Sequence, residues 1–372
     1  MALVRTGAER LAADPSLAGG ARLGLVTNPT GVLPDLTPTA DALWAAGLGL
    51  TALFGPEHGL RGSAQAAGGE ADTVDERTGL PVHDTYQREG EALDRVVAAS
   101  GVDTLVFDIA DVGARFYTYV WTMYDLLASA ARLGLRFVVL DRPNPLGGAV
   151  EEGPLLDPAF TSFVGRFPLP VRHGRTVGEL ALAFGFDVDL SVVEMEGWRR
   201  DMAFAETGLP WVMPSVNMPT VDTALVYPGT ALFEGTNFSE GRGTTRPFEL
   251  VGAPYADRRF APALAALGLP GVRFRETWFT PTFHKHAGMP VRGVQVHVHD
   301  REAYRPVLTG LSMLHVARTL YPDDLRWQGP GLFMDHLWGS DALTRCLEAG
   351  DDPRELCPPP RPPQGTLLYG DG

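Results

Sequence analysis

Short apolar runs alternate with amphipathic segments along the first half of the chain. Four runs have the length and character of buried strands: Leu23–Val26, Leu50–Phe54, Thr104–Phe107 and Phe137–Leu140. A helix is predicted between the first two, with Thr37 as its N-cap, Pro38 at its first position and Gly47 after its end. Helical spacing of apolar residues predicts another over Val120–Ala131. This alternation indicates a parallel sheet with helices on both faces.

The pattern changes towards the C-terminus. Thr176 and Glu179 form a capping box before an apolar segment that ends at Gly185, so we interpret Glu179 as a helix cap, and a strand is predicted over Val188–Val193. From about residue 248 onward the predicted elements are a helix, two strands and two helices, at 262–267, 272–279, 293–298, 302–320 and 335–349. We therefore predict a parallel α/β domain over residues 1–245 and a smaller α+β domain over 246–372, with an extended Pro-rich tail.

Composition narrows the class of protein. The 372 residues include 31 Lys+Arg and 45 Asp+Glu, and the net charge of −14 argues against broad binding to nucleic acid or to anionic membranes. No apolar run is long enough for a transmembrane helix, so we predict no membrane insertion. The first twenty residues lack the apolar core of a signal peptide, and two cysteines are too few for a disulfide framework. We therefore predict a cytoplasmic protein.

Lysine is almost absent from this chain. Of the 31 basic residues only Lys285 is a lysine, and the others are arginines. A compositional bias accounts for the arginines, and chance is one explanation for the single lysine. The alternative is that Lys285 occupies a place in the second domain where a planar guanidinium group does not fit.

Polar and ionisable side chains follow all four predicted strands of the first half. In an open parallel sheet, ligands bind beyond the carboxyl ends of the strands, so these side chains indicate a binding or catalytic site at that edge. The residues that we expect there are Asn28, Glu57, His58, Arg61, Asp111, Arg115, Tyr117, Arg142 and Asn144.

The pair Glu57-His58 is the best acid–base candidate. Gly55, Pro56 and Gly59 flank the pair and would hold the carboxyl in a fixed, partly desolvated place, which suits a general acid. The alternative is a loop glutamate paired with Arg61. The stretch 59–84 that follows is long for a plain connection, and we interpret it as either a cleft wall or a surface excursion.

A second polar cluster spans residues 234–245 and includes Glu234, Asn237, Glu240 and Arg242. It lacks the spacing of a phosphate-binding loop, and no dinucleotide-binding glycine motif follows the first strand. Its hydroxyls and glycines suit sugar hydroxyl groups, and Arg242 suits a carboxylate. Asn217 adds an amide between two prolines.

The histidines offer a weaker indication of a site. His297 and His299 would face one side of a predicted strand, with His284 and His286 nearby, but no acidic or cysteine residues of matching spacing accompany them. We therefore predict no metal site. His173 lies just before a predicted helix, and functional and structural roles both stay open for it.

Taken in order, these motifs resemble the exo-β-N-acetylmuramidase family of NamZ type. The matching segments are Thr27–Gly31, Pro56–Gly59, Phe107–Tyr119, Asp141–Pro145, Glu152–Pro154, Val171–Gly174, Asn217–Thr220, Glu234–Thr245 and Lys285–Gly288. The resemblance implies a Rossmann-like domain, a smaller C-terminal domain and a cleft between them, with no cofactor. It also implies release of β-1,4-linked N-acetylmuramic acid from the non-reducing end of peptidoglycan fragments in bacterial cell-wall turnover, and it maps the proposed catalytic glutamate onto Glu57.

We therefore expect a cofactor-free glycosidase that acts on muropeptide-type saccharides. Glu57 would be the general acid, and His58 would orient it or share its proton. The candidates for the second catalytic group are, in order of preference, Asp111, Glu240, Glu234 and Glu152. Arg115 or Arg242 would face the lactyl carboxylate of the substrate. The expected substrate-binding residues are Asn28, Arg61, Arg115, Tyr117, Arg142, Asn144, Glu152, His173, Asn217, Glu234, Asn237, Arg242, Lys285 and His286.

Two other classes of function stay open at this point. A non-catalytic muropeptide- or amino-sugar-binding protein would bind the same saccharide and release no product. A nucleotide-dependent α/β enzyme would need a glycine motif that the sequence lacks. The retaining, inverting or substrate-assisted course of a hydrolysis and the oligomeric state are not encoded in any pattern that we identify.

Overall fold

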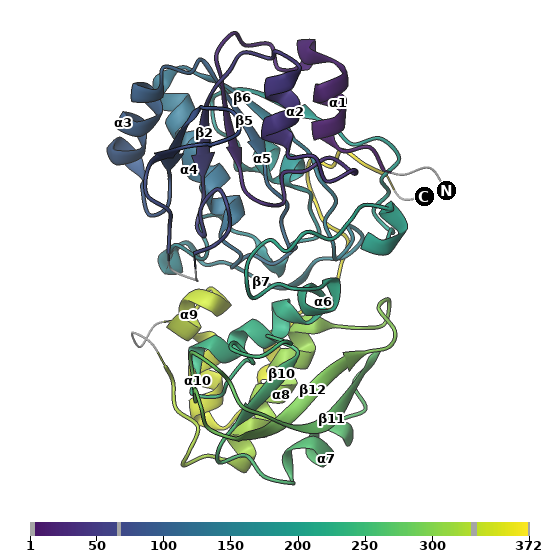
Figure 1. Cartoon of the computed structure of the whole chain (residues 1–372). Helices are drawn as coiled ribbons and strands as arrows, with labels where there is room; N and C mark the ends of the chain where they lie inside the picture. The colour runs from purple at the N-terminus through teal and green to yellow at the C-terminus, as the bar shows by residue number, and fades with distance from the viewer. Residues whose placement is uncertain (1–3, 65–67, 329–332, 371–372) are drawn as a thin grey trace.

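The structure, a computed structural model, describes residues 4–64, 68–328 and 333–370. It consists of a larger region and a smaller region, which Figure 1 shows one above the other. The larger region is built on a seven-stranded sheet with the order β3-β4-β2-β1-β5-β6-β9, parallel except for β3. Its strands are β1 (Leu23–Thr27), β2 (Leu50–Gly55), β3 (Thr73–Val74), β4 (Pro81–Asp84), β5 (Thr104–Asp108), β6 (Arg136–Leu140) and β9 (Asp189–Val193).

Helices cover both faces of this sheet. Helices α1 and α2 lie on one face, and α3, α4 and α5 lie on the other. Neighbouring strand residues face opposite sides, so Leu53 packs with the first pair of helices and Phe54 with the other three. The helix bounds are α1 (Gly7–Ala13), α2 (Thr39–Ala45), α3 (Gly90–Ser100), α4 (Tyr119–Leu133) and α5 (Val177–Phe184).

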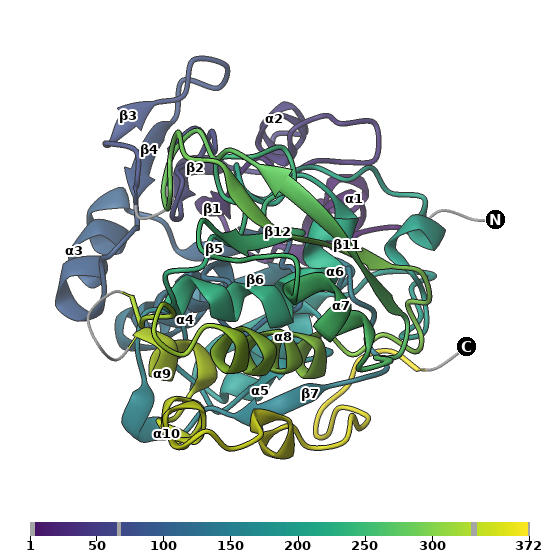
Figure 2. The same cartoon turned by 90° about the horizontal axis from the view of Figure 1, so that it is seen from below.

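The strand order confirms the predicted Rossmann-like α/β class. All four predicted apolar runs are neighbouring parallel strands, and the chain changes direction across the sheet between β1 and β5. Helix α2 begins one residue later than predicted, because Pro38 takes the N-cap position. In the long stretch 59–84, β4 pairs with β2 and β3 pairs with β4, so part of this stretch extends the edge of the sheet, as Figure 2 shows.

The smaller region has an antiparallel sheet with the order β10-β12-β11. Helices α6 and α8 pack closely, because a Cβ atom on Gly229 would lie 1.9 Å from the carbonyl oxygen of Pro306. The bounds are α6 (Val221–Thr230), β10 (Leu250–Ala253), α7 (Phe260–Ala265), β11 (Val272–Phe279), β12 (Val291–Val298), α8 (Pro306–Leu320), α9 (Phe333–Trp338) and α10 (Ala342–Ala349).

The contacts between elements favour a different domain boundary from the predicted one at residue 245. Helix α6 packs against α8, although it precedes residue 245, so we now propose a boundary just before α6. The tail returns to the larger region, where Arg361 pairs with Glu151 through both backbone groups and the Tyr369 hydroxyl donates to Asp141. Sequence patterns do not register such contacts, because they join residues more than 200 positions apart.

Several elements differ from the sequence prediction for local reasons. The helix predicted over 302–320 begins at Pro306, and the one predicted over 335–349 is two helices separated at Gly339. Gly339 has a φ of 88°, and a Cβ atom there would lie 2.7 Å from an Arg115 side-chain nitrogen, so glycine suits the position. Patterning did not reveal α1, α6 or the two-stranded sheet of β7 (Glu152–Leu155) and β8 (Pro170–Arg172).

Short 3-10 turns complete the chain. They are η1 (Pro15–Leu17), η2 (Pro158–Phe160), η3 (Phe204–Thr207), η4 (Ala231–Gly235) and η5 (Pro353–Leu356). In the described part of the chain, no helix combines the length and the apolar character that crossing a membrane requires.

Candidate active site

Glu57 lies two residues beyond the end of β2, at the carboxyl edge of the large sheet. Its side chain is buried, with 8% of the residue exposed, and its Oε2 accepts a hydrogen bond from Thr118 Oγ1 at 2.6 Å. Thr118 is the N-cap residue of α4 but makes no capping hydrogen bond with its side chain, so its hydroxyl serves Glu57 instead. Glu57 faces two adjoining pockets, of about 190 and 250 Å³.

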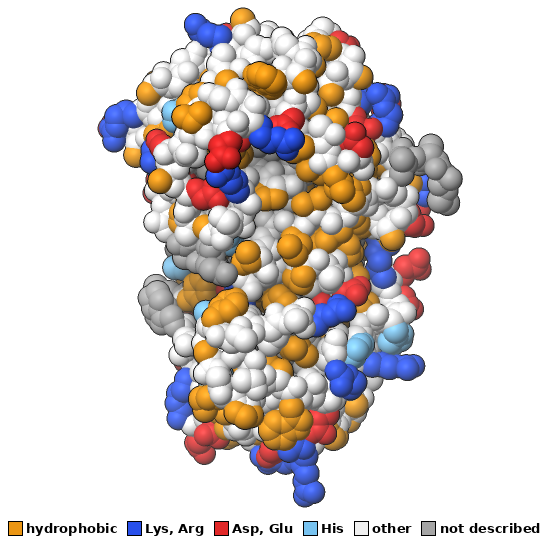
Figure 3. All heavy atoms as spheres, in the orientation of Figure 1, with side chains coloured by type: hydrophobic (Ala, Val, Ile, Leu, Met, Phe, Trp, Pro, Cys, Tyr) orange, Lys and Arg blue, Asp and Glu red, His pale blue; other side chains and the backbone are white. Residues whose placement is uncertain are grey.

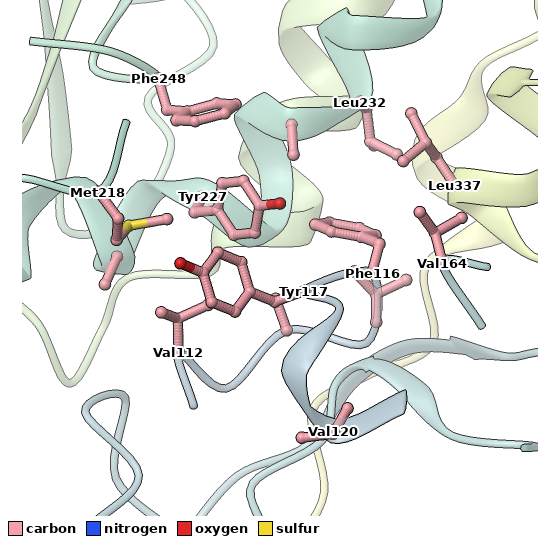
Figure 4. Close-up of a cluster of buried hydrophobic side chains, with 14 of the residues drawn as sticks. Val112, Phe116, Tyr117, Val120, Val164, Met218, Tyr227, Leu232, Phe248 and Leu337 are labelled. Atoms are coloured by element: carbon pink, nitrogen blue, oxygen red, sulfur yellow. The ribbon is translucent and has the colours of Figure 1, made fainter. Parts of the chain in front are cut away.

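The smaller of these pockets, which we call the central pocket, is lined by both regions of the molecule. Its polar lining includes six residues that the sequence nominated: Glu57, His58, Tyr117, Asn217, Glu234 and Arg242. Figure 4 shows Phe116 and Tyr117 from the loop before α4 meeting Tyr227 from α6 in the buried cluster beside it. On the face shown in Figure 3, hydrophobic side chains gather over the boundary between the two regions.

His58 is held next to Glu57 by the backbone of its own loop. Its Nδ1 donates to the carbonyl oxygen of Ala64 at 2.7 Å. The backbone there has a φ of 70°, in the left-handed region, and the ring meets Tyr119 edge to face. His58 is therefore fixed in orientation and lines the central pocket.

Aromatic side chains form much of the wall of the central pocket. The ring of Tyr227 makes T-shaped contacts with Phe116, Tyr117 and Phe248, at centroid distances of 5.3, 5.8 and 4.7 Å. Burial raises the pKa of Tyr117 and of Tyr227 well above the usual value, so both hydroxyls stay protonated and can donate hydrogen bonds.

Arg242 is the guanidinium group at the central pocket. Its Nη2 lies 3.1 Å from Glu234 Oε1, its Nε lies 3.4 Å from Glu240 Oε1, and its charge lies 5.0 Å from the centre of the Phe248 ring. Burial alone would lower the pKa of Arg242, but the two carboxylates outweigh it and raise that pKa. Arg242 therefore stays charged where a substrate carboxylate could meet it.

Glu240, by contrast, is fully buried and does not line the central pocket. Its Oε2 lies 2.8 Å from Lys285 Nζ, and its Oε1 lies 3.2 Å from His284 Nδ1. Burial alone would raise the pKa of Glu240, but His284, Lys285 and Arg242 outweigh it and hold that pKa below the usual range.

The surroundings of the Lys285 ammonium group suit a lysine at this position. Its Nζ donates to Glu240 and to the carbonyl oxygens of Phe233 and Phe238, at 2.8, 2.9 and 3.0 Å, and a further carbonyl lies 3.3 Å away. These acceptors converge on one point, which suits a compact ammonium group better than a planar fork. Lys285 and Glu240 therefore hold the 234–245 loop from inside.

Asp111 and His173 form a buried pair that lines neither of the pockets beside Glu57. The backbone N–H of Arg175 donates to His173 Nδ1, so Nε2 carries the proton and donates to Asp111 Oδ2 at 3.0 Å. Asp111 also accepts from Gly113 N at 2.6 Å. It lines a separate small pocket together with Arg142, whose guanidinium binds Asp108 in bidentate fashion at 2.6 and 2.9 Å.

The expected substrate-binding arginine Arg115 lies inside the protein. Its Nη1 donates to the carbonyl oxygens of Pro154 and Leu169, and its Nη2 donates to those of Leu337 and Trp338, at 2.7 to 3.0 Å. The side chain is fully buried, and the loss of hydration lowers the pKa of Arg115 to about 9. Arg115 thus joins the larger region to α9 of the smaller one and is not available to a ligand.

Glu152 likewise joins the two regions away from Glu57. Its Oε1 accepts from the backbone N–H of Leu308 at the start of α8, at 3.0 Å, and lies 3.5 Å from Arg305 Nε. This arrangement caps a helix of the smaller region with a carboxylate of the larger region.

The remaining nominated residues make local structural contacts. Asn144 donates to the carbonyl oxygen of Arg175. The Asn237 side chain donates to the carbonyl oxygen of Asp324, and His286 donates to the backbone carbonyl oxygen of Asn237. Asn28 accepts from Thr30 and, with Arg61, lines another pocket on the larger region.

Sequence reasoning missed several groups that line the two pockets. They include Thr118, Tyr119, Ser215, Tyr227 and Phe248 in the central pocket and Tyr86, Asp125 and Arg166 in the other. Thr118 and Tyr119 lie in a motif that we singled out, so position alone could have nominated them. Tyr227 lies on α6, which no capping or apolar pattern had identified.

The histidines do not gather into a metal site. Strand β12 ends at Val298, so His299 lies outside the strand that was expected to align it with His297. In residues 4–64, 68–328 and 333–370, no group of three or more His, Cys, Asp or Glu side chains could hold a metal ion.

A buried carboxyl at the edge of a Rossmann-like sheet, in a pocket with aromatic walls and hydrogen-bond donors, is an arrangement that suits a glycoside hydrolase. Models of the N-terminal and C-terminal parts of the exo-β-N-acetylmuramidase NamZ match residues 23–222 and 225–358. The chain therefore belongs to the exo-β-N-acetylmuramidase NamZ family.

Individual relatives agree with this assignment. The chain is 48% identical over 354 residues to the peptidoglycan β-N-acetylmuramidase NamZ of Bacillus subtilis strain 168, covering 93% of this chain and 85% of the relative. Two crystal structures of DUF1343 family proteins from Bacteroides fragilis NCTC 9343 have the same fold. The first has a TM-score of 0.87 and is 34% identical, covering 95% of this chain and 94% of its own. The second has a TM-score of 0.75 and is 29% identical, covering 95% of this chain and 93% of its own.

Proposed function

We propose that this protein removes β-1,4-linked N-acetylmuramic acid from the non-reducing end of peptidoglycan fragments, with Glu57 as the general acid. The observation that carries the proposal is the placement of Glu57, which is buried, accepts a hydrogen bond from Thr118 and lines two adjoining pockets. A carboxyl in that place can protonate the glycosidic oxygen as the bond to the leaving sugar breaks.

The second catalytic group is best assigned to Glu234. Of the four candidates that the sequence offered, Glu234 lines the central pocket together with Glu57, whereas Asp111, Glu240 and Glu152 face other surroundings. A carboxylate there can stabilise the positive charge that develops at the anomeric carbon or activate water. Its Oε1 lies 3.1 Å from Arg242 Nη2, and both residues line the pocket.

Arg242 is the group that we assign to the lactyl carboxylate of muramic acid. It lines the central pocket and is charged, whereas the other candidate, Arg115, spends its donors on four backbone carbonyls. A guanidinium group suits a carboxylate because its parallel N–H donors match two oxygens. We place the reaction in peptidoglycan turnover and recycling, and a cytoplasmic location for it stays a prediction.

The test is the change Glu57→Gln, assayed on a chromogenic N-acetylmuraminide and on a disaccharide of muramic acid and N-acetylglucosamine. We expect turnover to fall at least about a hundredfold with the fold intact, because glutamine cannot donate the proton. Glu196→Gln is the matched control, since Glu196 lies half exposed in ion pairs on the surface. Normal turnover by Glu57→Gln would overturn the assignment, and saccharide binding without product from the parent protein would favour a binding protein instead.

A further inference from the structure

A second pocket adjoins the central pocket and shares Glu57 with it. This side pocket, of about 250 Å³, shares Glu57, Thr118 and Phe163 with the central pocket, and all its other lining residues come from the larger region between Thr85 and Arg166. Because Glu57 faces both pockets, a glycosidic bond that it protonates lies where they meet. One sugar of the substrate then occupies each pocket.

The wall of the side pocket is a fixed polar network. Thr118, Thr122 and Asp125 lie at positions i, i+4 and i+7 and so share one face of α4. The guanidinium of Arg166 bridges two carboxylates, with Nη2 3.1 Å from Asp125 Oδ2 and Nη1 2.8 Å from Glu89 Oε2. Its Nε is buried and has no hydrogen-bond partner in the described part of the chain.

The charges of the side pocket suit a neutral ligand. Three carboxyl groups, those of Glu57, Glu89 and Asp125, line the pocket with two guanidinium groups, those of Arg88 and Arg166, so even with Glu57 protonated as the acid the pocket has no excess of positive charge for an anion. Hydroxyl and amide N–H groups can donate to the carboxylates, and hydroxyl or acetyl oxygens can accept from the guanidinium groups. Burial raises the pKa of Asp125 to about 6 against the opposing charge of Arg166, and low polarity strengthens such hydrogen bonds.

The two pockets also differ in how they are enclosed. The central pocket has walls from both regions, whereas the side pocket is lined by the larger region and includes Glu89, whose side chain is 64% exposed. Phe163, which is 53% exposed, lines both pockets. The ring of Phe163 stacks with Phe333 of the smaller region at 6.5 Å between centroids. The side pocket is therefore open to solvent at Glu89.

Building on the proposed function, we propose that the side pocket binds the sugar on the leaving-group side of the cleaved bond. Its ligand is a neutral N-acetylated hexosamine, and Asp125 and Arg166 are the residues that select it. The anionic muramic acid unit then lies in the central pocket, so the pair of pockets fixes which way round the substrate binds.

The test compares two substrates that share the muramic acid unit but differ in the leaving group. The disaccharide with N-acetylglucosamine offers hydroxyl and acetamido groups to the side pocket, whereas an aryl muraminide does not. The ratio of kcat/KM for the disaccharide to kcat/KM for the aryl substrate is measured for the parent, for Asp125→Asn and for Arg166→Lys. Asp189→Asn, which removes an exposed carboxylate paired with Arg136, is the matched control.

We expect the ratio to fall at least about tenfold in Asp125→Asn and in Arg166→Lys and to stay at the parent value in Asp189→Asn. Arg166→Lys keeps the charge and loses the planar fork, so it tests the site even where Asp125→Asn folds poorly. An unchanged ratio in both variants would overturn the inference, whether activity is kept or lost equally on the two substrates. If the parent cleaves neither substrate, the proposed function itself fails and the inference falls with it.

Discussion

Two glutamates in Gly-containing polar loops, Glu57 and Glu240, have opposite surroundings in this protein. Glu57 is held by a threonine hydroxyl and faces two pockets, whereas Glu240 is fully buried and lies against Lys285, His284 and Arg242. The first loop positions a carboxyl for chemistry, and the second uses a carboxylate as an internal tie. The comparison teaches that polar residues and glycines mark an ordered loop, while the volume in front of the side chain decides what the loop does.

The largest expected effect on stability comes from breaking the buried ion pair between Glu240 and Lys285. Glu240→Gln should lower the free energy of unfolding by about 3–5 kcal/mol, because it leaves Lys285 charged and buried without its carboxylate. Urea unfolding followed by circular dichroism measures this, with Glu196→Gln as the exposed control. A loss below about 1 kcal/mol would place Glu240 with the exposed carboxylates instead.

A third buried carboxyl, Asp141, sharpens the comparison because hydroxyl and N–H donors surround it in place of cations. Burial raises its pKa to about 6, against hydrogen bonds from Tyr369, Gly178 and Thr176. The folded state therefore binds this proton more tightly than the unfolded state does. The resulting contribution to the free energy of unfolding is complete below about pH 4 and is lost as the pH rises through 6. The rise of this pKa from 3.8 to about 6 corresponds to about 3 kcal/mol of unfolding free energy.

Asp141→Asn cannot ionise, so its unfolding free energy relative to the parent should rise by up to about 3 kcal/mol between pH 4 and pH 7. Denaturant titrations at the two pH values measure this difference. A constant difference between variant and parent would show that Asp141 keeps its charge when folded.

The change Lys285→Arg tests the same ion pair at its cationic partner. The acceptors around Nζ converge on one point, and a longer planar group must displace them, at a cost of about 1–3 kcal/mol in unfolding free energy. Thermal and urea unfolding of the variant and the parent measure the effect. Equal stability and equal turnover would make chance the better explanation of the single lysine.

The smallest expected change is the stability of Glu57→Gln. Glutamine keeps an acceptor oxygen for Thr118, and the side chain already faces open volume, so the free energy of unfolding should change by less than about 1 kcal/mol. We expect the same variant to lose its turnover. Replacing Glu57 should thus lower activity without lowering stability, whereas replacing Glu240 should lower stability. A loss of several kcal/mol at Glu57 would remove the contrast.

The sequence predicted the strands that position the site well, and the side chains that line the site less well. Apolar runs predicted the strands, and the strand ends located Glu57 and His58, because backbone topology brings those ends to one edge. The role of Arg115 was not predictable, since its four acceptors are backbone carbonyls that any residue type supplies. Asp125 was missed because a carboxylate on an amphipathic helix is usually a solvated one.

The link made by Arg115 has a consequence for synthesis of the chain. All strands of the large sheet are complete by residue 193, but two of the four Arg115 acceptors belong to Leu337 and Trp338. Arg115 is only three residues from Thr118, the partner of Glu57. A chain that stops before residue 337 can therefore form its sheet while the loop that carries Arg115 and Thr118 lacks two of its anchors, so we expect such a chain to be folded in its larger region and inactive.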